Sequence, residues 1–389
     1  SCSVREKPVH KVHSEVGRYK GLKAKKPQLK IGVGGCVGQQ EKKKLLSDVP
    51  LLDFVFGTDA IDKLPGIVES LETKDKVVEA KFEHQKPYQI QTLIKNPGVS
   101  TFINITKGCD NFCSFCVVPF TRGRERSRKL NELILDINSL VKRGVKEVTL
   151  LGQNVNSYKS ECGADFADLL EAVAQQTDIK RIRYTTSHPK DFNQKLVDIS
   201  QANREKVCDY IHLPVQSGNS EVLERMKRGY SREEYLDKVK MIMGAIPGVT
   251  LSTDIIVGFP GETEAQFEDT LSLLETVPYE SLYAFKYSPR PFTKAAKYED
   301  QLSEKEKSER LQRLFDLHRP IAFKLAEKYQ GQILEVLVEN QDEKTQNLTG
   351  RSTQNKLVHF KGSKDLISQV VKVKINEAFP QTLRGELIE

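Results

Sequence analysis

The stretch GCDNFCSFCVVPFTRGRERSR places Cys109, Cys113 and Cys116 within eight consecutive positions. Thiolates are soft ligands, and three of them suit zinc, copper(I) or an iron–sulfur centre. Structural zinc normally takes four ligands, and only the fold could bring His188 or His212 to such a site. A 4Fe–4S cluster held by three cysteines differs, because one iron keeps an open position at which a ligand can be activated. The spacing therefore predicts a metal centre and leaves its kind open.

Four arginines follow the cysteines at every second position. In an extended segment their side chains would share one face, whereas a helix would scatter them. One face of guanidinium groups is suited to contacts with phosphates or to stacking on splayed RNA bases. A solvated loop with Glu125 as an internal partner is the alternative. These candidate RNA contacts are Arg122, Arg124, Arg126 and Arg128.

The charge and cysteine content of the chain limit its class. The net charge is +7, yet residues 1–30 carry nine Lys and Arg against two Glu, and residues 107–129 carry six against two acidic residues. Two local basic zones predict a polyanionic partner at defined places, although a solvated helix face explains residues 1–30 equally well. The chain has seven cysteines, and this odd number of unevenly spaced residues argues against a disulfide framework. With no long apolar segment and no leader pattern, we expect a cytoplasmic protein without membrane contact.

Residues 1–75 have the pattern of a doubly wound α/β domain. A helix with a capping box is expected over residues 3–23, and two strand–turn–helix patterns follow it. Cys2 and Cys36 would lie in loops at the edge of the sheet where ligands bind. The strand that should precede Cys2 is missing, so we expect this domain to be truncated. The polar, proline-containing residues 76–100 predict a linker.

Residues 101–330 predict a partial (β/α)6 barrel within an overall α/β fold. Apolar strands alternate with helical patterns of period 3.6, which is typical of a parallel barrel with its chemistry at the carboxyl ends of the strands. The cysteine stretch follows the first strand and so belongs to that edge. Residues 331–389 alternate with period two between polar turns and predict a small, OB-like all-β barrel. The expected parallel strands are residues 101–106, 146–152, 181–187, 209–215, 249–259 and 281–288.

Several motifs together carry a resemblance to a known family. The stretch GCDNFCSFC after a first barrel strand, with Phe115 before the third cysteine, is similar to the signature of radical S-adenosylmethionine (SAM) enzymes. The motifs GGCVGQQ, LLGQNVNSY, TTSHP, HLPVQSGNSEVLERMKRGYSREEY and STDIIVGFPGET resemble the methylthiotransferase branch of that superfamily, over essentially the whole chain. The run TRGRERSR favours the members that modify tRNA over those that modify a ribosomal protein.

The resemblance implies a binding site for a cluster and for SAM. Cys109, Cys113 and Cys116 would hold a radical-generating 4Fe–4S cluster, whose open iron would bind the amino and carboxylate groups of SAM. Ordinary packing at the barrel edge is the alternative for the other positions. The residues that the resemblance places around SAM are Phe115, Gly152, Gln153, Asn154, Ser187, His188, Pro214, Gln216 and Gly258.

The resemblance also implies an auxiliary 4Fe–4S cluster that carries the inserted sulfur. Cys2 and Cys36 match two of its three cysteines, and the third would lie upstream of Ser1, so the ligand set is incomplete in this chain. The implied reaction begins with cleavage of SAM to methionine and a 5′-deoxyadenosyl radical, which takes a hydrogen from carbon 2 of adenine. A methylthio group, with its methyl from a second SAM, then joins carbon 2 of dimethylallyladenosine next to the anticodon.

The implied partners are the tRNA anticodon loop and an electron donor such as flavodoxin or ferredoxin, acting on a monomeric enzyme. Residues 331–389 would be the family's RNA-binding TRAM domain, with Arg351 and Lys356 as candidate RNA contacts. One departure is the pair Phe292 and Lys294, where the family usually shows a Gly-Thr-Pro turn. Two other functions remain open: methylthiolation of a ribosomal protein, and RNA binding by an iron–sulfur protein without turnover.

Overall fold

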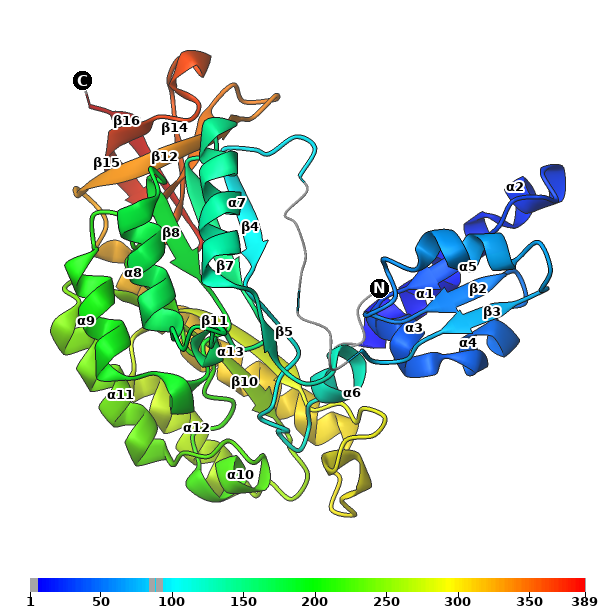
Figure 1. Cartoon of the computed structure of the whole chain (residues 1–389). Coiled ribbons are helices and arrows are strands. Elements are labelled where there is room, and N and C mark those ends of the chain that lie inside the picture. The colour runs from blue at the N-terminus through cyan, green and yellow to red at the C-terminus, as the bar shows by residue number, and fades with distance from the viewer. Residues whose placement is uncertain (1–5, 84–87, 89–93, 389) are drawn as a thin grey trace. The chain divides into compact units, whose positions relative to one another are not determined.

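The computed structural model describes residues 6–83, 88 and 94–388 (Figure 1). Its contacts form two compact units, and each is described by itself. The first unit comprises Ser1–Pro87, Lys107–Arg126 and Ser288–Tyr298, and the second comprises Tyr88–Thr106, Ser127–Tyr287 and Glu299–Glu389. The segment with the three cysteines therefore belongs to the same unit as the amino-terminal domain.

The first unit is built on a three-stranded parallel sheet in which β2 lies between β1 and β3. Val33 and Val55 are buried in it, as expected of β-branched residues on a sheet covered by helices. The predicted alternation of strands and helices is confirmed here. The strands are β1 (Gly32–Gly34), β2 (Phe54–Phe56) and β3 (Val77–Glu79).

Two expectations for this region differ from the structure. The expected linker over residues 76–100 begins with strand β3, because the amide of Val77 donates to the carbonyl of Asp53 at 3.0 Å and extends the sheet. The helix expected over residues 3–23 is divided at Tyr19, and its expected cap, Ser3, lies outside the described residues. The helices are α1 (Glu6–Arg18), α2 (Lys20–Lys25), α3 (Cys36–Glu41), α4 (Lys43–Asp48) and α5 (Leu64–Ser70).

The second unit contains the six parallel strands that the sequence predicted. They form two three-stranded sheets, β4-β7-β8 and β9-β10-β11, and a parallel bridge between Ile182 and Val207 lies between β8 and β9. Six parallel strands with helices between them confirm the partial (β/α)6 barrel. The strands are β4 (Ser100–Asn104), β7 (Glu147–Leu151), β8 (Arg181–Tyr184), β9 (Tyr210–His212), β10 (Thr250–Val257) and β11 (Tyr279–Lys286).

Helices cover the outer side of these strands (Figure 1). Capping boxes start four of them, at Asp165, Ser231, Thr263 and Ser303, where each side chain satisfies an amide that the helix leaves open. None of the described helices is long and apolar enough to cross a membrane. The helices are α7 (Leu130–Lys142), α8 (Phe166–Gln176), α9 (Gln194–Ala202), α10 (Ser220–Arg225), α11 (Arg232–Ala245), α12 (Glu264–Thr276) and α13 (Glu304–Glu327).

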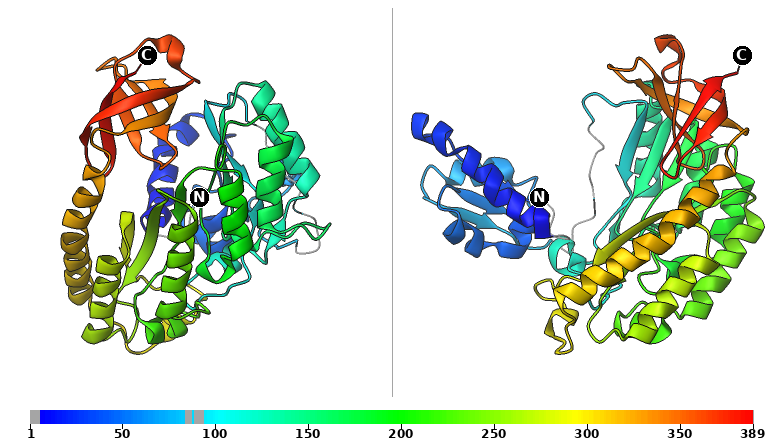
Figure 2. Two further views of the ribbon diagram at one scale, coloured as in Figure 1. Left: turned by 90° about the vertical axis from the view of Figure 1, so that its left-hand side faces the viewer. Right: turned by 180° about the vertical axis from the view of Figure 1, so that it is seen from behind.

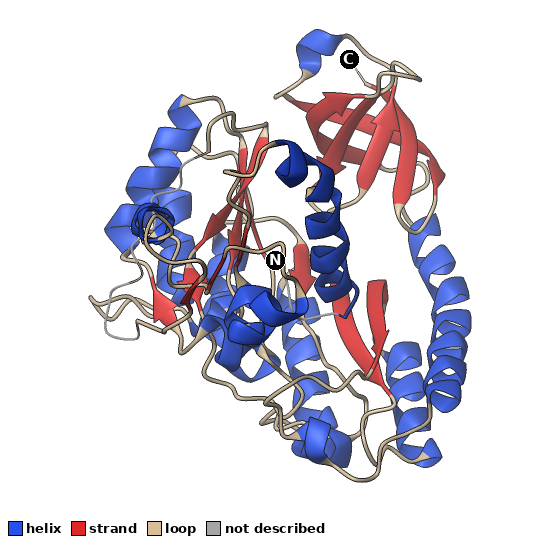
Figure 3. Ribbon diagram, turned by 90° about the vertical axis from the view of Figure 1, so that its right-hand side faces the viewer, coloured by secondary structure: helices blue, strands red, loops and turns tan. Residues whose placement is uncertain are grey.

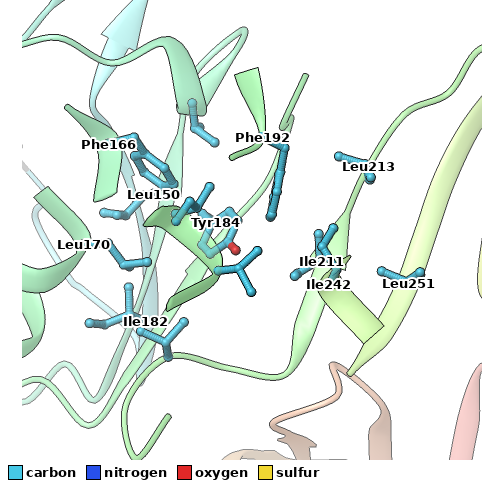
Figure 4. Packing of buried hydrophobic residues seen from close by; sticks show 14 of the residues in the cluster. Leu150, Phe166, Leu170, Ile182, Tyr184, Phe192, Ile211, Leu213, Ile242 and Leu251 are labelled. Carbon is cyan, nitrogen blue, oxygen red and sulfur yellow. The ribbon is translucent and has the colours of Figure 1, made fainter. Parts of the chain in front are cut away.

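The core of this unit lies between strands and helices (Figure 4). Leu150 and Ile182 from neighbouring strands belong to one buried cluster with Phe166 of α8, whose ring meets Tyr184 edge-on at 5.2 Å between centroids. Each of these side chains is almost fully buried, which stabilises the fold by about 1.5–3 kcal/mol for a side chain of this size. The core thus fixes the strands whose carboxyl ends carry the candidate site.

A closed five-stranded barrel ends the chain and confirms the small all-β barrel predicted for residues 331–389. Helix α13 leads into it (Figure 2), and Figure 3 shows the barrel strands in red. Val336, Val358 and Leu383 fill its interior. Its strands are β12 (Ile333–Gln341), β13 (Leu348–Ser352), β14 (Leu357–Phe360), β15 (Val370–Ala378) and β16 (Thr382–Leu387). The remaining elements are β5 (Thr106–Lys107), α6 (Val118–Arg122), β6 (Arg126–Ser127), η1 (Val155–Ser157), η2 (Pro189–Asp191), η3 (Ala295–Lys297) and η4 (Lys364–Leu366).

Candidate functional site

The three cysteines lie on the loop between β5 and α6. The amide of Cys116 donates to the carbonyl of Cys113 at 3.0 Å, and the amide of Cys109 donates to Gly123 at 3.2 Å. Cys109 and Cys113 are buried, and Cys116 is partly exposed. Burial raises the pKa of the Cys109 thiol to about 11. Because metals bind the thiolate, ligation at Cys109 must displace a firmly held proton.

These thiols are not gathered around one point. Among the described residues, no group of three or more His, Cys, Asp and Glu side chains stands ready to hold a metal ion. In a 4Fe–4S cluster each cysteine binds a different iron, so its ligands need not converge on a single ion. Three soft donors on one closed loop fit that cluster by their chemistry. Ligation by Cys109, Cys113 and Cys116 remains a prediction.

A buried carboxylate holds the base of the cysteine loop. Asp59 contacts the ammonium group of Lys107 and accepts a hydrogen bond from Arg126 Nη2 at 2.7 Å. In addition, the hydroxyl of Thr58 donates to the carbonyl of Thr121 at 2.8 Å. Burial lowers the pKa of Lys107, although Asp59 opposes the shift. The loop is therefore held by the residues that follow strand β2.

The arginines do not form the single exposed face expected of them. Arg122 ends helix α6, and Gly123, with φ 81°, turns the chain before Arg124. The Arg126 side chain is only 13% exposed because it pairs with Asp59. Arg128 is 3% exposed and pairs with Asp136 at 2.7 Å. Neither Arg126 nor Arg128 is thus available to RNA in this structure, whereas Arg124 is 59% exposed and paired with Asp110.

The carboxyl ends of the first three parallel strands form a polar cradle. Gly152 follows β7, and a Cβ atom there would lie 2.2 Å from Thr106 Oγ1, so only glycine fits. The carbonyl of Gly152 accepts a hydrogen bond from Thr186 Oγ1 at 2.9 Å. Thr186, after β8, has φ 64°, in the left-handed region that threonine rarely adopts. The structure thus brings Gly152 close to Thr106, a residue that the sequence patterns did not indicate.

Asn154 and His188 connect two of these strand ends. Asn154 Oδ1 accepts from the amide of His188 at 3.2 Å, and its Nδ2 donates to Asp191 at 2.6 Å. His188 Nδ1 accepts from the amide of Lys190 at 3.3 Å. Burial, reinforced by the positive charges of Arg228 and Lys190, lowers the pKa of His188 to about 2. The imidazole is therefore neutral at physiological pH.

Three buried polar atoms at these strand ends have no hydrogen-bond partner in the described structure: Thr106 Oγ1, Ser187 Oγ and His188 Nε2. Buried polar groups are almost always hydrogen-bonded, so an orphan points to a missing partner. All three lie at the carboxyl ends of the parallel strands, where ligands bind in such folds. These atoms fit a polar ligand such as SAM.

The other positions expected around SAM follow the carboxyl ends of strands β9 and β10. The carbonyl of Pro214 accepts a hydrogen bond from Arg228 Nη2 at 2.9 Å. Gln216 has φ 78° and bridges to Ile255 on β10. A Cβ at Gly258, which has φ 68°, would meet Lys307 Cγ at 2.4 Å. All three are fixed by the packing around them, and their contact with SAM remains a prediction.

Arg351 and Lys356 lie where the small barrel contacts the parallel strands, and the burial of Lys356 corrects its expected exposure to RNA, whereas the Arg351 side chain is 38% exposed and its contact with RNA remains a prediction. The carbonyl of Arg351 accepts from Arg181 Nη1 at 2.6 Å. Lys356 is 5% exposed, and its Nζ lies 2.8 Å from Glu280 Oε2 at the start of β11. In the same turn, Ser352 accepts from Arg183 Nη2 at 2.6 Å. A buried ammonium paired in this way cannot reach a phosphate.

The remaining predicted residues are placed without a decisive contact. Cys36 is buried at the first turn of α3, and Cys2 lies outside the described residues. Phe115 is partly exposed between Cys113 and Cys116, and Gln153 follows Gly152. Sequence reasoning missed Asp59 and Thr106. No local signal marks them, because their partners come from other segments of the chain.

Comparison with known proteins identifies the class. Residues 103–274 match the radical SAM superfamily, residues 327–388 the TRAM domain, and residues 1–57 an uncharacterized protein family, UPF0004. A solved radical S-adenosylmethionine methyltransferase, TsrM, from Kitasatospora setae has a TM-score of 0.55 at 14% identity, over 74% of this chain and 60% of that chain. The fold is that of a radical SAM enzyme.

Curated relatives narrow this class further. A protein of Bdellovibrio bacteriovorus is 62% identical over all of this chain and 86% of its own length. Proteins of Geotalea uraniireducens and Bacillus subtilis are 44% and 43% identical, over all of this chain and 89% and 77% of their lengths. Each is named tRNA-2-methylthio-N(6)-dimethylallyladenosine synthase. The chain belongs to this family of radical SAM methylthiotransferases.

Proposed function

We propose that this protein adds a methylthio group to carbon 2 of N6-dimethylallyladenosine next to the anticodon of tRNA. The observation that carries the proposal is the continuity between two features. Thr106, whose buried hydroxyl has no hydrogen-bond partner in the described structure, lies in β5, which runs directly into the loop with Cys109, Cys113 and Cys116. A cluster on that loop and a ligand at Thr106 would belong to one stretch of chain.

Cys109, Cys113 and Cys116 would hold a 4Fe–4S cluster that, when bound, supplies one-electron reduction of SAM. The chain's own residues bind and orient the ligand. The hydroxyls of Thr106 and Ser187 can hydrogen-bond to the polar groups of SAM, and the absence of a Cβ at Gly152 leaves room beside Thr106. Because His188 is neutral, it would add no positive charge to a site that takes up the positively charged SAM.

The sulfur to be inserted requires a second centre. We propose that Cys2 and Cys36 are ligands of an auxiliary 4Fe–4S cluster. A flavodoxin- or ferredoxin-type donor would supply the electron to a monomeric enzyme, and the reaction would take place in the cytoplasm. Methylthiolation of a ribosomal protein is the second candidate, favoured only by the shared chemistry of the branch.

The direct test uses anaerobically reconstituted protein, SAM, a reductant and tRNA from a strain that lacks the methylthio group. We expect mass spectrometry of the nucleosides to show 2-methylthio-N6-dimethylallyladenosine, and its loss in Cys116→Ser. A matched Cys162→Ser variant changes an exposed thiol outside the loop and should retain the product. Formation of 5′-deoxyadenosine without any methylthio product on tRNA, but with product on a ribosomal protein, would support the second candidate.

A further inference from the structure

Three exposed phenylalanines lie together in the first unit. Phe112 and Phe120 come from the cysteine segment, and Phe292 comes from the segment 288–298. Their exposed fractions are 39%, 39% and 58%. The rings of Phe112 and Phe120 meet edge-on with centroids 6.4 Å apart, and those of Phe120 and Phe292 are tilted at 6.0 Å. We call these residues the phenylalanine cluster.

Two members of this cluster have backbone conformations that phenylalanine rarely adopts. Phe112 has φ 48° and Phe292 has φ 70°, in a region that bulky residues rarely adopt. Such conformations cost free energy and persist only where the surroundings enforce them, often at binding sites. Here the amide of Ala295 donates to the carbonyl of Ser114 at 2.9 Å, which ties the two segments together. The arrangement is therefore fixed and presents aromatic rings to solvent.

Positive charge surrounds the cluster. Residues 107–126 and 288–298 together carry seven Lys and Arg against Asp110 and Glu125. Two of the cations, Lys107 and Arg126, are paired with Asp59, which leaves a net excess. The guanidinium of Arg124 lies 5.1 Å from the centroid of the Phe112 ring and also pairs with Asp110 at 2.9 Å.

We propose that the phenylalanine cluster is a stacking surface for unpaired bases of an RNA loop. Sequence-tolerant RNA sites combine aromatic rings, which stack on bases, with basic side chains, which attract the backbone. An arginine over an aromatic ring adds a cation–π contact to the same surface. The proposal rests on the proposed tRNA substrate and extends it, because these rings would hold bases that flank the target next to the cysteine loop.

The sequence provides a sensitive test, because the chain contains no tryptophan. In Phe292→Trp, the single indole reports stacking through quenching of its fluorescence. The probe is a hairpin RNA with an unpaired anticodon loop, added without SAM. We expect strong quenching by the hairpin and little by a fully paired duplex of equal length. The matched control is Phe323→Trp, whose site on α13 is 47% exposed in the second unit.

A second measurement separates stacking from simple proximity. Phe292→Leu and Phe120→Leu should each weaken hairpin binding by about tenfold, the size of one lost base stack, while Phe323→Leu should not. Quenching by an acidic electron-donor protein but not by RNA would overturn the proposal and assign the surface to that protein. Equal quenching by duplex and hairpin would also overturn it. Quenching by the hairpin in a protein that forms no methylthio product would contradict the proposed function and leave the stacking surface intact.

Discussion

Asp59 and Arg126, 67 positions apart in the sequence, are joined by a hydrogen bond of 2.7 Å between Oδ1 and Nη2. The same oxygen contacts the ammonium of Lys107. Lys107 and Arg126 are the first and last residues of the cysteine segment in the first unit, so one carboxylate closes both ends of it. Burial of Asp59 disfavours its charge, but hydrogen bonds from Lys107, the amide of Glu83 and Arg126 hold its pKa below the usual range.

Replacing Asp59 tests this closure. Asp59→Asn leaves Lys107 and Arg126 without their anion, and breaking such a buried pair costs about 3 kcal/mol of unfolding free energy. Urea unfolding at neutral pH should show this loss, and the cysteine loop should exchange its amide hydrogens faster. The exposed pair of Asp237 and Lys240 provides the control, and Asp237→Asn should change stability by less than about 0.5 kcal/mol.

The effect of Asp59→Asn on the free energy of unfolding should depend on pH. Because the pKa of Asp59 is lowered by folding, its stabilising effect is present above the unfolded value of 3.8 and is lost as pH falls through the folded pKa. The difference between wild type and Asp59→Asn should thus be constant near neutrality and shrink below pH 3.8. A difference that stayed constant down to strongly acidic pH would show that the carboxylate charge is not what holds the loop.

The Ser187→Ala variant tests whether the hydroxyl of Ser187 binds a ligand or stabilises the fold. Its Oγ has no partner in the described structure, so Ser187→Ala should leave the unfolding free energy of the ligand-free protein unchanged or higher. It should weaken SAM binding about tenfold, because a hydrogen bond to the ligand is lost. Ser200→Ala is the matched control: Ser200 Oγ donates to the carbonyl of Leu196 at 2.7 Å, so stability should fall while SAM binding stays the same.

His188 should make the protein sensitive to mild acid. Its pKa is about 2 in the folded state because of burial, against an ordinary value of 6.5, so the unfolded chain takes up the proton first. Stability from this group is complete above pH 6.5 and falls with decreasing pH, by up to about 1.4 kcal/mol per pH unit. His188→Asn should flatten the stability curve between pH 6.5 and 4. Parallel curves for the two proteins would contradict a neutral, buried His188.

Lys356 should anchor the small barrel. Lys356→Gln leaves Glu280 without one of its buried partners. We expect the free energy needed to separate the small barrel from the parallel strands to fall by about 3 kcal/mol. Hydrogen exchange of the amides in β13 and β14 should rise as a result. Lys372→Gln, an exposed lysine on β15 of the same barrel, should leave exchange unchanged. Equal exchange in both variants would mean that the buried ion pair does not hold the turn in place.

Local sequence patterns were sufficient to predict the helices and strands. They were insufficient to predict the contacts between residues that are distant along the chain. The regular succession of strand segments and helical patterns located β10 within residues 249–259, because the type of an element is encoded largely within its own segment. The contact between the small barrel and the parallel strands and the closure of the cysteine loop both depend on residue pairs that are distant along the chain. Glu280 and Lys356, for example, lie in different domains of the sequence. The spacing of the arginines therefore suggested an RNA contact for Arg126, and the family resemblance suggested one for Lys356, although both side chains are buried in ion pairs.

For the candidate site, too, local patterns indicated the residues but not their contacts with distant segments. Cysteine spacing and the family motifs indicated the metal ligands and the strand ends. The orphan hydroxyl of Thr106 became visible only when the fold placed it against Gly152. Phe292 was noted in the sequence as a departure, and its contact with Phe120 required two segments that are distant along the chain.

The most direct test of the account is the iron content and SAM cleavage of a variant in which Cys109, Cys113 and Cys116 are all replaced by serine. After anaerobic reconstitution, the variant should hold about four fewer irons per chain than wild type, the content of one 4Fe–4S cluster. On reduction with SAM it should form no 5′-deoxyadenosine, whereas wild type should form it. Equal iron content and equal 5′-deoxyadenosine in both proteins would contradict the assignment of the cluster to this loop.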